Sequence, residues 1–143
     1  MTFTIGSICW PEDPLLSLHL YLDFLVLAIN KINVDFSDFE DDPIKITRLF
    51  LDGTGSNESR KQACLIWWDY IDKKNALQDF QDRDILLARL AICLLSVSET
   101  DRDNLGEHLS WFLELIFYLN KDVDNLIVMM ESYFKPYIKV SSG

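Results

Sequence analysis

The sequence predicts an all-α fold: a compact bundle of about five main helices with residues 85–97 at its centre. The main observation is residues 85–97 themselves, where eleven of thirteen side chains are apolar. Leu and Ala dominate this stretch, and both are strong helix formers. A helix that is apolar all round has no face to give to water, so other helices must surround it. Asp82 or Asp84 is expected to cap its start.

Two further observations support a bundle. Other stretches of helical length begin with capping residues and are joined by short polar links, which is typical of packed helices. The chain of 143 residues suits one domain, and it shows no internal repeat, low-complexity segment or interdomain linker. Residues 1–143 are therefore assigned to one all-helical domain.

The first elements are predicted from alternation and from a capping sequence. Residues 1–10 show a weak alternation of apolar side chains, which predicts a short strand or an ordered arm. A helix is predicted over residues 14–32. Asp13 can cap this helix, and Pro14 suits its first position because proline has no N–H to donate.

An acidic loop and an ambiguous segment come next. Residues 33–42 hold five carboxylates, two phenylalanines and no basic side chain. In residues 43–51, the pair Asp42–Pro43 favours a helix start, whereas the β-branched side chains favour a strand. A short helix is the preferred prediction. Residues 52–57 are rich in Gly, Ser and Asn and are predicted to form a loop.

A helix over residues 58–74 is predicted after this loop, with Ser56 or Asn57 as its cap. It contains the neighbours Trp67 and Trp68, which point about 100° apart on a helix. Two core side chains are the preferred interpretation, and the alternative places one of them in the core and the other near the surface, where Asp69 and Asp72 follow.

Two helices complete the predicted bundle. A polar link over residues 99–104 leads into a helix over residues 105–120, and Asp122 is expected to cap a last helix over residues 123–134. Pro136 marks the end of the last helix or a kink before it. The tail from about residue 137 is predicted to be extended and then disordered.

The charge of the chain restricts its partners. With 23 acidic and 13 basic residues, the net charge is −10. This excess repels nucleic acid phosphates and anionic membranes and attracts basic proteins, so the sequence predicts a protein partner and neither a nucleic acid nor a membrane partner. No apolar run reaches about 18 residues without a charge, and the N-terminus lacks the pattern of a signal peptide. Three widely spaced cysteines suit a reducing cytosol, so a cytoplasmic location is predicted.

Motifs that carry chemistry are missing from the sequence. It contains no GxSxG, no HExxH and no Gly-rich phosphate loop. His19 and Asp23 share a helix face, but a metal site needs three or four ligands, and no second pair has matching spacing. A hydrogen-bonded polar pair is the preferred interpretation. No catalytic residue, cofactor or metal ion is predicted.

The acidic loop is the preferred candidate for binding a partner. Carboxylates around aromatic side chains suit docking of a basic protein, since the charges steer the partner and a buried aromatic side chain holds it. A solvated loop without a binding role is the alternative. The candidate partner-binding residues are Asp35, Phe36, Asp38, Phe39, Glu40, Asp41 and Asp42. A secondary candidate surface consists of helical acids, namely Asp69, Asp72, Asp79, Asp82 and Asp84.

As a whole, this small, acid-rich chain without a catalytic motif, signal peptide or metal site resembles the immunity proteins of bacterial polymorphic-toxin and contact-dependent growth inhibition systems. The resemblance is one of type and covers the whole length, without a specific motif. It implies a cytoplasmic antitoxin that binds a basic toxin, most simply a nuclease domain, and blocks its active site. A related option is a phage-encoded inhibitor whose carboxylates mimic nucleic acid phosphates.

Two other classes of function stay open. Arg102 and His108 resemble the Arg-x(4–6)-His signature of HEPN domains, small all-α proteins that often cleave RNA. That resemblance would give Arg102 a role in holding phosphate and His108 a role in proton transfer, although the negative charge of the chain opposes RNA binding. The third class is a helical adaptor or self-associating subunit, for which a homodimer is an allowed form.

Overall fold

The computed structural model describes residues 4–34, 36, 39, 42–74, 82–119 and 121–138. Six α-helices and three short 3₁₀ turns account for most of this part, which confirms the all-α fold. The helices begin and end within two residues of the predicted bounds. They are α1 (Pro14–Lys31), α2 (Pro43–Leu51), α3 (Asn57–Lys73), α4 (Arg83–Leu95), α5 (Leu105–Tyr118) and α6 (Val123–Tyr133), and the 3₁₀ turns are η1 (Ile5–Ser7), η2 (Glu99–Asn104) and η3 (Lys135–Tyr137).

Side-chain caps start most of these helices. The carboxylates of Asp13, Asp42, Asp82 and Asp122 accept hydrogen bonds from backbone N–H groups in the first turn of α1, α2, α4 and α6. Such bonds satisfy donors that have no partner within the helix. The cap by Asp42 explains why residues 43–51 form a helix despite their β-branched side chains, so the preferred prediction for this segment is confirmed.

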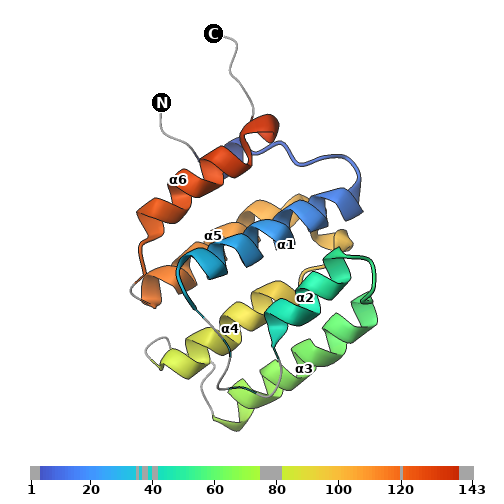
Figure 1. The fold of residues 1–143 in the computed structure, drawn as a ribbon, viewed down its shortest axis with the longest axis vertical. Helices are drawn as coiled ribbons and strands as arrows, with labels where there is room; N and C mark the ends of the chain where they lie inside the picture. The colour runs from blue at the N-terminus through green and yellow to red at the C-terminus, as the bar shows by residue number, and fades with distance from the viewer. Residues whose placement is uncertain are drawn as a thin grey trace.

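Helix α4 lies at the centre of the bundle. Every residue from Ile85 to Leu95 is buried, and the helix packs against α2, α3 and α5. Figure 1 shows α1 in front of α5 and α2 in front of α4, with α3 and α6 at opposite ends of the long axis. The prediction that this segment is surrounded by the other helices is confirmed.

The N-terminal segment is an ordered arm. It forms η1, followed by an isolated antiparallel bridge between Ile8 and Ile138, and the N–H of Cys9 donates to the carbonyl of Tyr137 at 2.6 Å. The part of the chain that the structure describes contains no strand longer than this bridge. Residues 137–138 of the predicted tail are therefore tied to the arm, and residues 139–143 lie outside the described part.

Helix α1 is the one described helix that is long and apolar enough to cross a membrane, with 18 residues and a mean hydropathy of 1.2. The sequence predicts no membrane span. In the fold, 50% of this window is buried, and Leu18, Tyr21, Leu22 and Leu25 are fully enclosed by neighbouring helices. Helix α1 therefore has the contacts of a core helix in this bundle.

The three cysteines differ in exposure. Cys9 is exposed, whereas Cys64 and Cys93 are buried, as their positions within apolar runs predict. Burial raises the pKa of the Cys93 thiol to about 12 and also raises the pKa of Cys64. Since the thiolate is the reactive form, the two buried thiols are expected to be inert in the folded chain at neutral pH.

A thiol reagent is therefore expected to modify Cys9 rapidly and the other two cysteines only after denaturant is added.

The burial of Cys93 also predicts that the stability of the fold depends on pH. The unfolded chain loses the Cys93 proton near its ordinary pKa of 9.0, whereas the folded chain keeps it up to about 12. The free energy of unfolding should thus fall as pH rises from 9 to 12, and Cys93→Ala should make that fall shallower. Rapid modification of all three thiols in the folded chain would contradict the burial of Cys64 and Cys93 from which both predictions are made.

Candidate partner-binding site

The structure describes only part of the predicted site. Among the candidate residues, Asp35, Asp38, Glu40, Asp41 and Asp79 lie outside the described part of the chain. The structure describes the other candidates. Their positions show how the acidic loop lies relative to the helical acids. The described candidates are Phe36, Phe39, Asp42, Asp69, Asp72, Asp82 and Asp84.

The two phenylalanines of the acidic loop pack on α3. The ring centroid of Phe39 lies 4.8 Å from that of Trp67 and 5.6 Å from that of Tyr70, and Phe36 lies 6.0 Å from Trp67. These are favourable distances for edge-to-face and tilted aromatic pairs. Both described aromatic residues of the acidic loop are thus attached to the C-terminal half of α3.

This packing corrects one part of the prediction. Phe36 is only 4% exposed and belongs to the hydrophobic core, so its side chain offers no surface to a partner. Phe39 is half-buried and keeps an accessible edge. The role of apolar anchor for a partner can therefore fall to Phe39 and not to Phe36, because the fold uses Phe36 to hold its own loop.

Helix α3 presents one tryptophan to the core and one to the surface. Trp67 is 3% exposed and Trp68 is 38% exposed, so the preferred interpretation of two core side chains is wrong for Trp68 and the alternative holds. Asp69 and Asp72 follow on the exposed side of the helix. The carboxylate of Asp69 pairs with the ammonium of Lys73 at 2.9 Å, and both groups are largely exposed, so this pair contributes little to stability.

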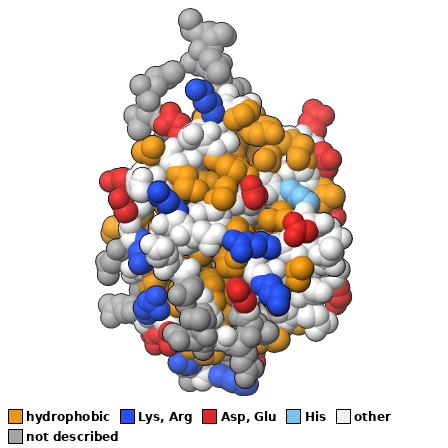
Figure 2. All heavy atoms as spheres, viewed as in Figure 1, with side chains coloured by type: hydrophobic (Ala, Val, Ile, Leu, Met, Phe, Trp, Pro, Cys, Tyr) orange, Lys and Arg blue, Asp and Glu red, His pale blue; other side chains and the backbone are white. Residues whose placement is uncertain are grey.

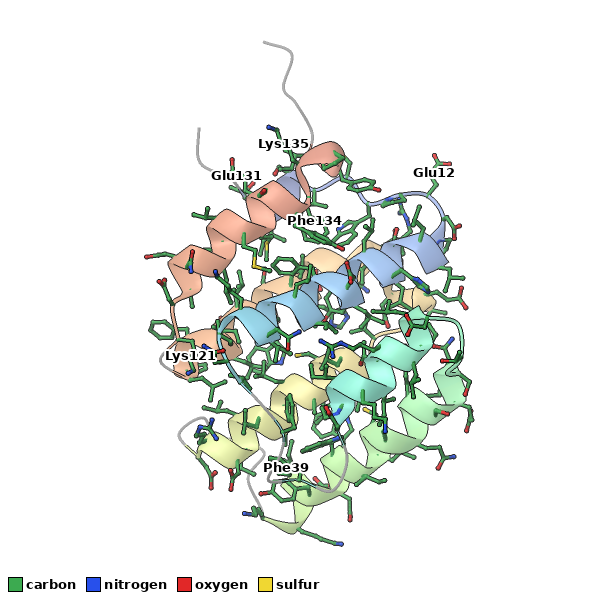
Figure 3. The ribbon with its side chains drawn as sticks, viewed as in Figure 1. Glu12, Phe39, Lys121, Glu131, Phe134 and Lys135 are labelled. Atoms are coloured by element: carbon green, nitrogen blue, oxygen red, sulfur yellow. The ribbon has the colours of Figure 1, made fainter. Side chains whose placement is uncertain are left out.

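Tyr70 joins the two predicted surfaces. One side of its ring contacts Phe39 of the loop, and the ammonium of Lys74 lies 4.9 Å from the ring centroid. The pKa of Lys74 is raised, first by its hydrogen bond and charge interaction with Tyr70 and then by Asp82 and Asp84. Helix α4 therefore begins within electrostatic range of Lys74, whose ammonium lies over the Tyr70 ring. Figure 3 shows Phe39 at the end of the molecule where α3 ends and α4 begins.

We call this region the acidic end, with Phe39, Asp42, Asp69, Tyr70, Asp72, Asp82 and Asp84 as its described members. The structure thus brings the primary and the secondary candidates together on one surface. Sequence reasoning did not include Tyr70. Its spacing of three from Trp67 and four from Lys74 is the signal that could have placed all three on one face of α3.

Basic side chains accompany the acidic ones over much of the described surface. Figure 2 shows Lys and Arg side chains between the acidic ones on the face formed by α1, α2 and α6. Helix α2 contributes exposed Lys45 and Arg48. Lys73 and Lys74 likewise stand beside Asp69 and Tyr70 at the acidic end, so the arrangement of basic side chains favours neither surface.

The two residues of the alternative nuclease hypothesis have different surroundings. Arg102 donates from Nε to the carbonyl of Pro11 at 2.6 Å and from Nη2 to the carbonyl of Trp10 at 2.8 Å. It thereby holds the N-terminal arm. His108 lines a pocket of about 180 Å³ together with Arg89, Trp68 and Trp111, and Arg102 is not part of that lining.

The pair of His19 and Asp23 is divided between two partners. Asp23 accepts a hydrogen bond from the hydroxyl of Tyr133 at 2.9 Å, and the ring of His19 lies 5.4 Å from that of Phe50. The preferred interpretation of a hydrogen-bonded polar residue thus describes Asp23. Within the described ranges, no three His, Cys, Asp or Glu side chains lie close enough to hold a metal ion.

Comparison of the chain with protein-family models, with curated proteins and with solved structures finds no match in any of the three.

Proposed function

We propose that the protein is a cytoplasmic immunity-type inhibitor, which binds a basic toxin domain of the nuclease class through the acidic end and thereby neutralises it. The observation that supports this proposal is the convergence at Tyr70. Both described aromatics of the acidic loop pack on α3, and Asp82 and Asp84 at the start of α4 act on the ammonium of Lys74, which lies over the Tyr70 ring. Acidic side chains of α3 and of the start of α4 thus accompany a half-buried aromatic pair, Phe39 and Tyr70.

The proposed binding has two physical components. Exposed carboxylates attract a cationic partner over a distance of about a Debye length and raise the rate of association, an effect that salt screens. The accessible edges of Phe39 and Tyr70 bury apolar surface once the partner has docked, and such contacts mainly slow dissociation. A nuclease active site is suitably basic because it binds phosphates.

The test begins with identification of the partner by co-purification from the native host. The partner is then produced alone in bacterial cells and is expected to stop growth, and this chain is expected to restore it. Asp69→Lys/Asp72→Lys should slow association about tenfold at low salt and flatten its salt dependence. Glu12→Lys/Glu58→Lys is the matched control, because it changes the net charge equally at exposed positions outside the acidic end.

Three results would overturn the proposal. The first is an unchanged association rate in the Asp69/Asp72 variant with an intact fold, which would move the interface away from the acidic end. The second is cleavage of RNA by the purified chain that is lost in His108→Ala, which would favour the HEPN-like ribonuclease. A partner that is harmless when produced alone would favour the adaptor class.

A further inference from the structure

Helix α5 borders a groove whose lining shares no residue with the acidic end. A hollow of about 370 Å³ lies between η1 and the start of α5, and a second of about 520 Å³ lies between α5 and α6. The two hollows share Ile5 and Ser110 in their lining, so they adjoin, and we treat the pair as one groove. We call it the α5–α6 groove. Figure 1 shows α6 at the opposite end of the long axis from α3.

The groove is apolar where α5 meets α6. Leu113 and Phe117 of α5 face Val123 and Ile127 of α6, and Ile5 of the arm closes the other side. Phe117 is 66% exposed, which is unusual for so large an apolar side chain in a chain with an extensive core. Its exposure leaves an aromatic ring available at the side of a depression.

Carboxylates line the rim of the same groove. Asp103 and Glu107 line the first hollow, and Glu114 lines the second. Spacings of seven and three residues from Glu107 through Glu114 to Phe117 place these side chains along one stripe of α5, and Asp103 lies just before it in η2. Among the described residues, no Lys or Arg lines either hollow.

One of these carboxylates already has a cationic neighbour. Asp103 pairs with Arg102 at 2.9 Å, whereas neither Glu107 nor Glu114 takes part in an ion pair between described residues. The negative charge of the rim is therefore carried mainly by the two glutamates of α5. An apolar floor with an acidic rim is complementary to a helix that has one apolar and one basic face.

We infer that the α5–α6 groove binds a basic amphipathic helix of a partner protein. The apolar side chains of that helix pack on Phe117 and on the floor between α5 and α6, and its Lys or Arg side chains face Glu107 and Glu114. The stretch from Glu107 to Tyr118 measures roughly 17 Å at about 1.5 Å per residue, so about three helical turns of the partner cover it.

A second copy of this chain fits the groove less well. Its net charge is −10, and an acidic rim would face another acidic chain. Like charges brought together across an interface oppose association. The inference goes beyond the proposed function, because it concerns a different surface and holds whether or not the partner is a toxin.

The first test uses a synthetic helix of about 15 residues with Leu on one face and Lys on the other. Its affinity for the full chain is measured by fluorescence anisotropy, with a peptide of the same composition in scrambled order as the reference. Glu107→Lys/Glu114→Lys is expected to weaken binding of the amphipathic peptide by about tenfold or more. Glu12→Lys/Glu58→Lys carries the same net charge and should leave the affinity within about twofold.

The second test examines the apolar half of the groove. Phe117→Ala should weaken binding about tenfold, because it removes the exposed ring at the groove. Leu65→Ala is the matched control, since Leu65 is also 66% exposed but lies on α3. Circular dichroism and the urea midpoint of each variant establish that the fold is intact.

Three results would overturn the inference: equal weakening by both charge variants, equal binding of the scrambled peptide, or unchanged binding in Phe117→Ala. Each of these results would show that the peptide is not held by the apolar and acidic side chains of the groove.

The variant Asp69→Lys/Asp72→Lys separates this inference from the proposed function. Peptide binding retained in that variant, together with failure to neutralise a toxin, supports both proposals, whereas peptide binding abolished only in that variant moves the peptide site to the acidic end.

Discussion

Replacing Leu90 or Leu94 by alanine is expected to lower the free energy of unfolding by about 2–5 kcal/mol, because each change leaves a cavity in a closely packed core. Both side chains are 0% exposed and lie on α4, which is covered on all sides by other helices. The neighbouring side chains can move into the cavity only partly, so the close packing around the deleted atoms is not restored. This is among the largest effects expected for truncation of a single side chain in the described part of the chain.

Urea unfolding followed by circular dichroism measures this decrease in stability. Leu65→Ala is a suitable control, because Leu65 is 66% exposed and its truncation leaves no cavity. The control is expected to change the free energy of unfolding by less than about 0.5 kcal/mol. A change of that small size at Leu90 or Leu94 would show that α4 is not the core helix.

Replacing Arg60 by methionine is expected to lower the free energy of unfolding by about 2–4 kcal/mol, because two buried carbonyls would lose a charged donor. Arg60 is 2% exposed, and its Nη2 donates to the carbonyls of Leu94 at 2.8 Å and Val97 at 2.6 Å. These carbonyls lie at the end of α4, where the helix itself provides no donor. The positive charge is also favourable at the negative end of the helix dipole.

The surroundings of Arg60 explain why a charge is tolerated there. Its guanidinium lies 4.8 Å from the ring centroid of Phe50 and also donates to the side chain of Asn57 at 3.1 Å. Burial lowers the pKa of Arg60 to about 10, so the group still carries its charge at neutral pH. Methionine keeps much of the apolar stem but offers no donor to the two carbonyls.

The measurement is again urea unfolding, with Lys61→Met as the control. Lys61 is the next residue of α3 and is exposed, so its replacement should cost less than about 0.5 kcal/mol. Hydrogen exchange should also show faster opening at the C-terminal end of α4 in the Arg60 variant. Equal stability of the two variants would show that the carbonyls find other donors.

The positions of the helices could be predicted from the sequence because the signals are local. Asp13 before Pro14 and Asp42 before Pro43 specify helix starts through contacts within three residues. The apolar run of α4 predicts its central position for a similar reason, since a helix without a polar face must be enclosed. Neither inference needs knowledge of the rest of the chain.

The candidate site could be predicted only in part. The composition of residues 33–42 draws attention to the acidic loop, but nothing in the loop shows that Phe36 points inwards. That orientation depends on Trp67, more than thirty residues further along the chain. For the same reason the sequence separates two acidic surfaces that the fold brings together at Tyr70.

The sequence by itself determined the helical class, the helix bounds, the central position of α4 and the large negative charge. Only the tertiary structure decided that Arg60 caps α4 from within the core, that Arg102 holds the N-terminal arm, and that exposed Phe117 borders a groove with an acidic rim. The physical reason is the range of the interactions. Capping and periodicity act within one or two turns, whereas burial and packing between helices depend on partners that the chain brings close only when it folds.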